Sequence, residues 1–290
     1  MQLQRHPANP ILTTVAGHEW ENRTCFNAAV VYEEGLFHLL YRAQGTADNI
    51  SRIGYAVSRD GIHFARLDRP VLAPETESER WGVEDPRITR LGDRLYMLYT
   101  AYSAHGTRVS LASARNPLAW QRAGIVLPDE NNKDAALFPA QVGGRYAMLH
   151  RRPPDIWLAW SDDLLHWSGH QAIMRPRPGL WDETCVGAGG PPLRTERGWL
   201  LIYHGYNRER VYCLGLALLD LENPSIVLSR PAEPILVPSE PWERSGEVPN
   251  VVFTCGSAVV GDEVYVYYGA ADMRMALATA RLQDVMQAFR

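Results

Sequence analysis

Short strand-like stretches, each ending on an aromatic or aliphatic residue before a polar one, recur along the whole chain. Five of them resemble one another and read GLFHLLYR, DRLYMLYT, GRYAMLHR, GWLLIYHG and DEVYVYYG. Such runs, separated by turn residues, are typical of β-strands. Their equivalent positions are Tyr41, Tyr99, Leu149, Tyr203 and Tyr267, so the stretch recurs after 58, 50, 54 and 64 residues. This spacing predicts one structural unit repeated five times.

Each stretch is followed by a second predicted strand, and most repeats contain one further short apolar element. The second strands read SRIGYAVS, RVSLASA, DIWLAWS, YCLGLALL and RMALATA, and the further elements read RPVLAP, GIVLP, QAIM and EPILVP. The fifth repeat has no such element after it, but NPIL at residues 9–12 offers one. Five units of about four strands, with the chain ends meeting in one unit, predict an all-β fold: a five-bladed β-propeller closed by the N-terminal strand.

Two other architectures fit the sequence less well. A β-sandwich does not need so regular a spacing, and a doubly wound α/β fold needs amphipathic helices, for which LQDVMQAF is the one candidate. The mean spacing of 56.5 residues, taken five times, accounts for about 283 of the 290 residues. We therefore expect residues 1–290 to form a single catalytic domain with its site in the ring.

Composition and charge narrow the possible functions. The 9 Trp, 13 Tyr, 23 Gly and 20 Pro suit short strands joined by many turns. A net charge of -4 argues against general binding to nucleic acid or to an acidic membrane. Neither a membrane helix of roughly 18 apolar residues nor a signal-peptide core is found, so we expect a cytoplasmic protein. The four cysteines form no CxxC pair, so neither a metal site nor a disulfide framework is expected.

Polar residues fall at equivalent places near the expected central axis. Counting back 14 positions from each repeat position leads to Asn27, Asp85, Ala135, Gly189 and Phe253. Asn27 and Asp85 are therefore expected at the start of two innermost strands, where side chains from different blades converge. Neighbouring strand residues face opposite sides, so Glu84 is expected to point away from the axis. A turn-capping role for Asp85, or a pair with Arg87, is an equally simple interpretation.

A second set of residues directly follows the repeat positions, at the channel end of each blade. It comprises Arg42, Thr100, His150, His204 and Tyr268, and Arg151 follows in the third repeat. Buried polar groups need partners, so this many of them indicate a binding funnel rather than a packed core. Taken singly, His204 would more simply be a satisfied buried histidine and Arg151 a solvated surface charge.

Eleven short motifs together resemble those of one family. In chain order they are FNAAVV, YRAQG, SRIGYAVSRDGIHF, GVEDPR, NKDAALFP, YAMLHRR, GAGGPP, GWLLIYHG, ALLDLENPS, VPNVVF and YYGAAD. Over almost its whole length the chain thus resembles glycoside hydrolase family 130, the mannoside phosphorylases and related β-mannosidases, which are five-bladed propellers. The resemblance implies inverting phosphorolysis of β-mannosides, such as β-mannobiose or short β-mannooligosaccharides, to mannose 1-phosphate. Inorganic phosphate would be the co-substrate, without any other cofactor.

The resemblance also implies roles for individual residues. Asp85 of GVEDPR corresponds to the general acid, which protonates the glycosidic oxygen through a hydroxyl group of the mannose. The residues that correspond to mannose-binding positions are Asn27, Arg42 and Asp272, and those that correspond to phosphate-binding positions are Lys133, Arg151 and His204. The expected partners are a β-mannosyl oligosaccharide and phosphate, and a homo-oligomer is compatible with the sequence.

One position departs from the family pattern. A phosphorylase is expected to carry a lysine in the segment before GAG, where this chain has Cys185. A neutral thiol does not replace an ammonium group toward phosphate, and a lost charge-assisted hydrogen bond costs about 1.5 to 3 kcal/mol. We therefore expect phosphate binding to be weakened by about 10- to 150-fold, but not abolished.

Two other functions stay open at this point. A hydrolase of the same family would use water and would need a second carboxylate as base, about 6.5 to 9.5 Å from the acid. Glu183 and Asp134 are the candidates, although a turn residue and a strand cap are simpler interpretations of them. A non-catalytic glycan-binding propeller would keep the mannose-binding residues but would not depend on Asp85. No motif indicates the linkage or the acceptor sugar.

Overall fold

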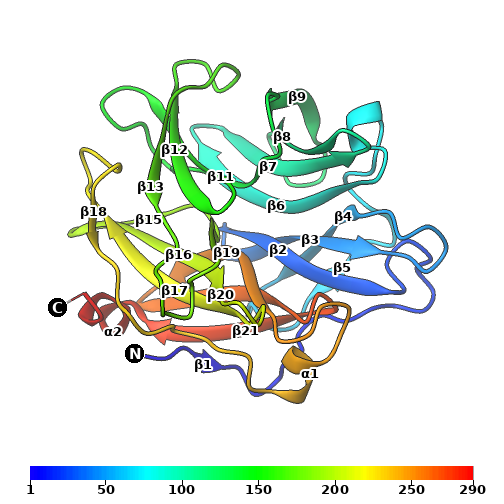
Figure 1. Cartoon of the computed structure of the whole chain (residues 1–290). Coiled ribbons are helices and arrows are strands. Elements are labelled where there is room, and N and C mark those ends of the chain that lie inside the picture. Colours follow the sequence, from blue (N-terminus) through cyan, green and yellow to red (C-terminus); the bar gives the residue numbers. More distant parts are fainter. Residues whose placement is uncertain (290) are drawn as a thin grey trace.

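Five antiparallel β-sheets follow one another along the chain and form the blades of a ring (Figure 1). The computed structural model describes residues 1–289; residue 290, the last of the predicted domain, lies outside them. The innermost strands of blades 1 to 3 each contact that of the next blade, the innermost strand of blade 5 contacts the second and third long strands of blade 4, and blade 5 also contacts blade 1. The predicted all-β, five-bladed propeller is confirmed.

The blades consist of consecutive segments, with one exception at the N-terminus. Blade 1 contains β2 (Thr24–Glu33), β3 (Leu36–Gln44), β4 (Arg52–Ser58) and β5 (Ala65–Arg66). Blade 2 contains β6 (Gly82–Leu91), β7 (Arg94–Ser103), β8 (Gly106–Ala114) and β9 (Gln121–Leu127). Blade 3 contains β10 (Lys133–Leu137), β11 (Tyr146–Arg152), β12 (Asp155–Ser161) and β13 (Ser168–Met174). Blade 4 contains β14 (Cys185–Ala188), β15 (Leu193–Thr195), β16 (Gly198–Tyr206), β17 (Tyr212–Leu219) and β18 (Val227–Ser229). Blade 5 contains β19 (Val252–Val260), β20 (Glu263–Ala270), β21 (Arg274–Arg281) and the N-terminal β1 (Gln4–Arg5).

Helices are few and short. They are a 3-10 helix (Glu77–Glu79), α1 (Pro241–Arg244) and α2 (Leu282–Gln287). Among residues 1–289, no helix has both the length and the apolar character needed to cross a membrane.

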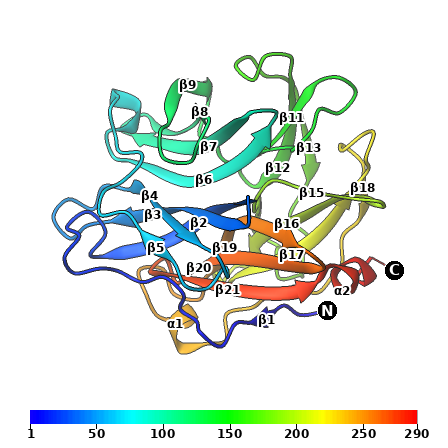
Figure 2. The ribbon, with the colours of Figure 1, turned by 180° about the vertical axis from the view of Figure 1, so that it is seen from behind.

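The N-terminal segment closes the ring at the outer edge of blade 5. Gln4 of β1 pairs with Thr279 of β21, and Leu12, within the predicted NPIL element, forms a separate bridge to Met275. The two chain ends consequently lie on the same side of the molecule in both views (Figures 1 and 2). Closure by the N-terminal strand is therefore confirmed, although the regular strand lies upstream of NPIL.

Apolar side chains are buried between the blades. Each of the five large hydrophobic clusters contains residues from two neighbouring blades. Between blades 1 and 2, for example, Leu40 packs in the same cluster as Met97 and Tyr99. Hydrophobic burial is the dominant favourable term in folding, so these five interfaces hold the ring together. The space at the axis is thereby left for polar side chains.

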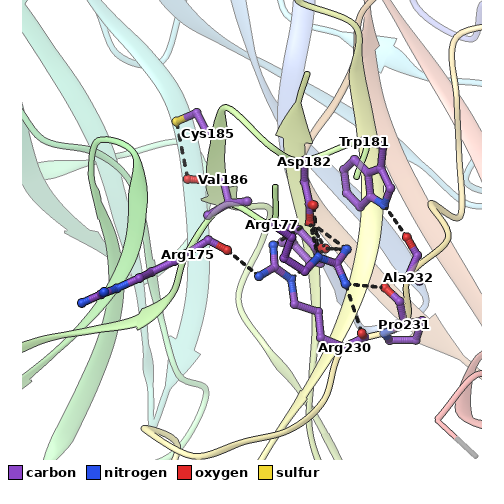
Figure 3. Close-up of polar contacts among 10 residues, drawn as sticks. Arg175, Arg177, Trp181, Asp182, Cys185, Val186, Arg230, Pro231 and Ala232 are labelled. Carbon is purple, nitrogen blue, oxygen red and sulfur yellow. Dashed lines mark hydrogen bonds and ion pairs between the residues drawn. The ribbon is translucent and has the colours of Figure 1, made fainter. Parts of the chain in front are cut away.

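A buried tyrosine, carboxylate and arginine connect the outer and inner parts of blade 4. The Tyr203 hydroxyl donates to Asp182 Oδ2 at 2.7 Å, and Arg230 Nη2 contacts the same oxygen at 2.6 Å. Arg177 adds a further contact of 2.8 Å to Asp182, and Figure 3 shows both guanidinium groups beside this carboxylate. The ring of Trp181 stacks on Tyr203 with centroids 5.4 Å apart. Asp182 thus anchors the segment that precedes β14.

Three other blades repeat this triad of a carboxylate that precedes the innermost strand, a second-strand tyrosine and an outer-strand arginine. The triads are Glu21 with Tyr41 and Arg66, Glu79 with Tyr99 and Arg122, and Glu243 with Tyr268 and Arg5. In blade 5 the tyrosine is therefore Tyr268 and not the predicted Tyr267, which donates to the Gly61 carbonyl.

Blade 3 carries an uncharged version of the same triad. Asn132 Nδ2 and His150 Nδ1 are 2.9 Å apart, and His150 Nε2 lies 3.0 Å from Nδ1 of His170. The repeat position in this blade is therefore His150, one residue after the predicted Leu149. Burial lowers the pKa of His150 to about 3 and also lowers that of His170, so both rings are neutral at neutral pH.

Replacement of Asp182 by alanine tests the triads. The variant leaves two arginines and the Tyr203 hydroxyl without their buried acceptor, so we expect the free energy of unfolding to fall by about 3 kcal/mol. Urea denaturation measures this change. The matched control is Asp162→Ala, which removes the exposed partner of Arg145 and is expected to cost less than about 0.5 kcal/mol. Equal losses in the two variants would contradict the structural role of the triad.

Acid sensitivity tests the neutral triad of blade 3. Because the pKa of His150 is lower in the fold than the ordinary value of about 6.5, the unfolded chain takes up the proton more readily, and stability falls as the pH drops below about 6.5. The variant His150→Gln keeps a polar side chain that does not titrate. We expect it to lose less stability than the wild type between pH 7 and pH 5 in thermal melts. Parallel melting-temperature curves would show that His150 does not contribute.

Candidate active site

A polar cavity of about 130 Å³ lies near the axis of the ring, and residues from all five blades line it. Six of the seven predicted site residues line it, namely Asn27, Arg42, Asp85, Lys133, Arg151 and Asp272. The remaining wall is formed by Arg210, Tyr212, Val248, Val251 and Phe253. Residues that are far apart in sequence are therefore brought together as the repeat predicts, and His204 is the predicted site residue that does not reach the cavity wall.

The inner strands of blades 1, 2 and 3 are interrupted by the same irregularity. Pairing with the second strand shifts between Phe26 and Ala29, between Glu84 and Arg87, and between Lys133 and Ala136. Inside these shifts Asn27, Asp85 and Asp134 have left-handed φ values of 50°, 49° and 53°. Such a backbone is uncommon for residues other than glycine and concentrates at functional sites. The equivalent residue in blade 3 is therefore Asp134, and the predicted Ala135 is wrong by one position.

Asp85 is buried and held by two donors from blade 1. Its Oδ1 accepts from Asn27 Nδ2 at 2.9 Å and from Arg42 Nη1 at 3.2 Å. Burial by itself would raise the pKa of Asp85, but the charges of Arg42, Lys133 and Arg87 outweigh it and hold the pKa below its ordinary value. Arg87 donates to the Asp85 backbone carbonyl and not to its carboxylate, so the predicted alternative of an Asp85–Arg87 pair is wrong.

Glu84 lies closer to the site than strand alternation predicts. Its Oε1 accepts from Arg42 Nη2 at 2.7 Å, so Glu84 and Asp85 share one guanidinium group. The left-handed backbone at Asp85 breaks the alternation, because a bulge places two residues opposite one. Glu84 nevertheless does not line the cavity, and its role is to hold Arg42 in place.

Asp272 is the second carboxyl group on the cavity wall. Burial raises its pKa to about 6, the nearby charges of Asp85 and Glu84 add to this rise, and Arg42 and Lys133 oppose it. Two carboxyl groups with pKa values pushed in opposite directions are typical of acid–base sites. At neutral pH Asp85 is therefore ionised, whereas Asp272 changes its charge near pH 6.

Lys133 and Arg151 occupy facing positions on β10 and β11 and form the cationic wall. Arg151 Nη1 contacts Asp134 Oδ2 at 2.9 Å. Behind this pair, His204 Nε2 lies 3.2 Å from Asp134 and 3.5 Å from Arg151. Burial lowers the pKa of His204 to about 4, so its ring is neutral at neutral pH. In this arrangement His204 contacts Arg151 and does not face the cavity itself.

The two candidate bases for hydrolysis lie outside the cavity. Asp134 is fully buried and contacts the cations Arg87 and Arg151, which hold its pKa well below the ordinary value although burial opposes them. Glu183 contacts Arg208 at 3.5 Å and is not a wall residue. Neither carboxylate is placed to take a proton from a water molecule in the cavity.

The two halves of the cavity differ in chemistry. Blades 1, 2 and 5 supply the carboxyl groups, Asn27 and Arg42, whereas blades 3 and 4 supply Lys133, Arg151 and Arg210. Such a site can deliver a proton on one side and hold an anion on the other. No cluster of three or more histidine, cysteine or acidic side chains suited to a metal ion occurs within residues 1–289. Arg210 escaped the sequence analysis because it lies in a turn outside every recognised motif, and Tyr212 escaped it because this residue only begins the predicted strand YCLGLALL.

Comparison with known proteins places these features in context. A family model described as beta-1,4-mannooligosaccharide phosphorylase matches residues 2–290. A 1,2-beta-oligomannan phosphorylase of Thermoanaerobacter sp. (strain X514) is 49% identical, with 98% of this chain and 99% of the relative covered. A beta-1,2-mannobiose phosphorylase of the same organism is 47% identical over 98% of this chain and 99% of its own. The beta-1,2-mannobiose complex of a Listeria innocua beta-1,2-mannobiose phosphorylase superposes with a TM-score of 0.93 at 30% identity, covering 100% and 99% of the two chains.

The variant Asp272→Asn tests the electrostatics of the cavity. Because the pKa of Asp272 is about 6 in the fold and about 3.9 in an unfolded chain, its ionisation destabilises the fold as the pH rises from 4 through 6. We expect the variant to be more stable than the wild type at pH 7.5, by about 1 to 3 kcal/mol, and equal to it near pH 4. Chemical denaturation at both pH values measures this, with the exposed Asp262→Asn as control. A variant less stable than the wild type at pH 7.5 would contradict the assignment.

Proposed function

The chain belongs to glycoside hydrolase family 130, and from this premise we propose that it is an inverting phosphorylase of β-mannosides that releases mannose 1-phosphate. The names of the relatives favour β-1,2-linked mannobiose or oligomannan as the substrate. One observation of the cavity carries the proposal: buried Asp85, beside sugar-binding donors, faces the same space as the cations Lys133 and Arg151. That combination suits an acid and an anionic nucleophile that act on one bond.

In the proposed reaction, Asn27, Arg42 and Asp272 hold the mannosyl unit. A phosphate oxygen attacks C1 of the mannose while the bond from C1 to the glycosidic oxygen breaks on the opposite face. The proton passes from Asp85 to a mannose hydroxyl group, whose own proton goes to the leaving oxygen. Phosphate is already anionic and therefore needs cations to position it and no general base.

The protonation of Asp85 depends on charge in the cavity. Its carboxyl group has a lowered pKa because the charges of Arg42, Lys133 and Arg87 outweigh the effect of burial. A phosphate dianion beside Lys133 would offset part of that positive charge and would raise the pKa of Asp85. Phosphate binding would thus prepare the acid as well as supply the nucleophile.

Hydrolysis is disfavoured as the main reaction. It requires a base near the attacking water, and neither Asp134 nor Glu183 lines the cavity. A purely glycan-binding propeller would have no use for two facing cations beside a buried carboxyl group. Both alternatives are outcomes of the experiment below.

Product analysis with β-1,2- and β-1,4-mannobiose, each with and without phosphate, tests the function. We expect mannose 1-phosphate to form only with phosphate, and faster from the β-1,2-linked substrate. Free mannose formed at equal rates without phosphate would identify a hydrolase. Sugar binding without turnover would identify a binding protein.

The variant Asp85→Asn tests the acid assignment. Removal of a general acid lowers turnover by about 10²- to 10⁴-fold. The control Glu183→Gln alters an acidic residue outside the cavity and should retain turnover within about twofold of the wild type. Full activity of Asp85→Asn, measured as mannose 1-phosphate release, would show that another group supplies the proton.

A further inference from the structure

Arg210 brings a third cation to the cavity from the loop between β16 and β17. The backbone φ of Arg210 is 60°, in the left-handed region that residues other than glycine seldom adopt. The turn is held by Asn207, whose carbonyl accepts from the Arg210 backbone at 3.0 Å and whose Oδ1 accepts from the Val211 backbone at 3.0 Å. A strained backbone with such local support is common where a side chain must be aimed at a site.

Arg210 forms no close ion pair in the described part of the chain. Within residues 1–289, neither Arg210 nor Lys133 has a carboxylate oxygen within 4.0 Å, whereas Arg151 contacts Asp134 at 2.9 Å. Two cations that face one small cavity without a close ion-pair partner raise the local concentration of anions. Both side chains can therefore bind a doubly charged ligand without first breaking a close ion pair.

The residues around Cys185, which stands where a phosphorylase is expected to carry a lysine, lead from this position to the cavity wall near Arg210. Cys185 is buried, does not line the cavity, and its Sγ lies 3.8 Å from the Val186 carbonyl (Figure 3). It pairs across the sheet with Tyr206, whose ring lies 4.5 Å from that of Tyr212. Tyr212 in turn lines the cavity together with Arg210, which precedes it by two residues. The two tyrosines therefore lie between position 185 and the cavity wall that Arg210 shares.

We propose that Arg210 is a phosphate-binding residue that supplies, from the neighbouring loop, the positive charge absent at Cys185. This inference rests on the proposed phosphorolysis. With Lys133 and Arg151 it completes a set of three cations on the walls from blades 3 and 4. A guanidinium group can donate two parallel hydrogen bonds to phosphate, which a lysine cannot, so its contribution includes orientation of the nucleophile.

The experiment compares Arg210→Met with Arg208→Met, its matched control. Arg208 lies on the same loop and is 85% exposed, but it contacts Glu183 and does not line the cavity. In phosphorolysis of β-1,2-mannobiose, we expect Arg210→Met to raise the KM for phosphate by about 10- to 100-fold. The KM for mannobiose should change by less than about threefold, and Arg208→Met should match the wild type in both constants. For Arg210→Lys we expect a KM for phosphate between those of the wild type and Arg210→Met, because lysine keeps the charge but cannot donate two parallel hydrogen bonds.

The result distinguishes this inference from the proposed function. If the wild type releases mannose 1-phosphate but Arg210→Met keeps the phosphate KM of Arg208→Met, the inference is wrong and the function stands. A rise confined to the KM for mannobiose would place Arg210 at the sugar and would also overturn it. If the wild type shows no phosphorolysis, the proposed function fails. Calorimetric titration of the wild type and Arg210→Met with inorganic phosphate then decides the inference, which requires tighter binding by the wild type.

Discussion

The centre of the ring depends on the buried carboxylate of Asp134. It contacts Arg87 of blade 2 at 3.2 Å, Arg151 of its own blade at 2.9 Å and His204 of blade 4 at 3.2 Å. Removal of one partner from a buried ion pair strongly destabilises a protein, because the other charge stays buried without compensation. The cluster leaves no room for extra atoms: a Cβ at Gly187 would lie 2.3 Å from His204 and 2.5 Å from Asp134. Three blades are thereby tied together at the axis.

This cluster also governs the charge of the cavity. Asp134 offsets much of the positive charge of Arg87 and Arg151, while Lys133 and Arg210 remain without ion-pair partners among the described residues. Their charge explains how a protein with a net charge of -4 can hold a site for an anion. The acid and the cations stay apart because they come from different blades.

The outer parts of the blades provide the rigidity that such a site needs. Apolar clusters fill the spaces between blades. Within four of the five blades, a triad of a carboxylate, a tyrosine and an arginine adds buried hydrogen bonds. Blade 3 uses the neutral Asn132, His150 and His170 instead. Asn132 precedes Lys133 and His150 precedes Arg151 in the chain, so the acid-sensitive triad supports the two cations of the same blade.

The sequence by itself determined the repeat, the five blades and the positions of Asn27 and Asp85, because strand and turn residues have local preferences and the spacing counts the blades. Only the tertiary structure decided what the bulges do. The bulge in blade 2 brought Glu84 beside Asp85 on Arg42. In blade 3 the equivalent residue is Asp134 and not Ala135, because 16 positions separate Asp134 from His150, against 14 between Asp85 and Tyr99. Likewise, only the structure placed His204 behind Arg151 and Arg210 on the wall, because such positions depend on backbone conformation and on contacts between blades that no local pattern encodes.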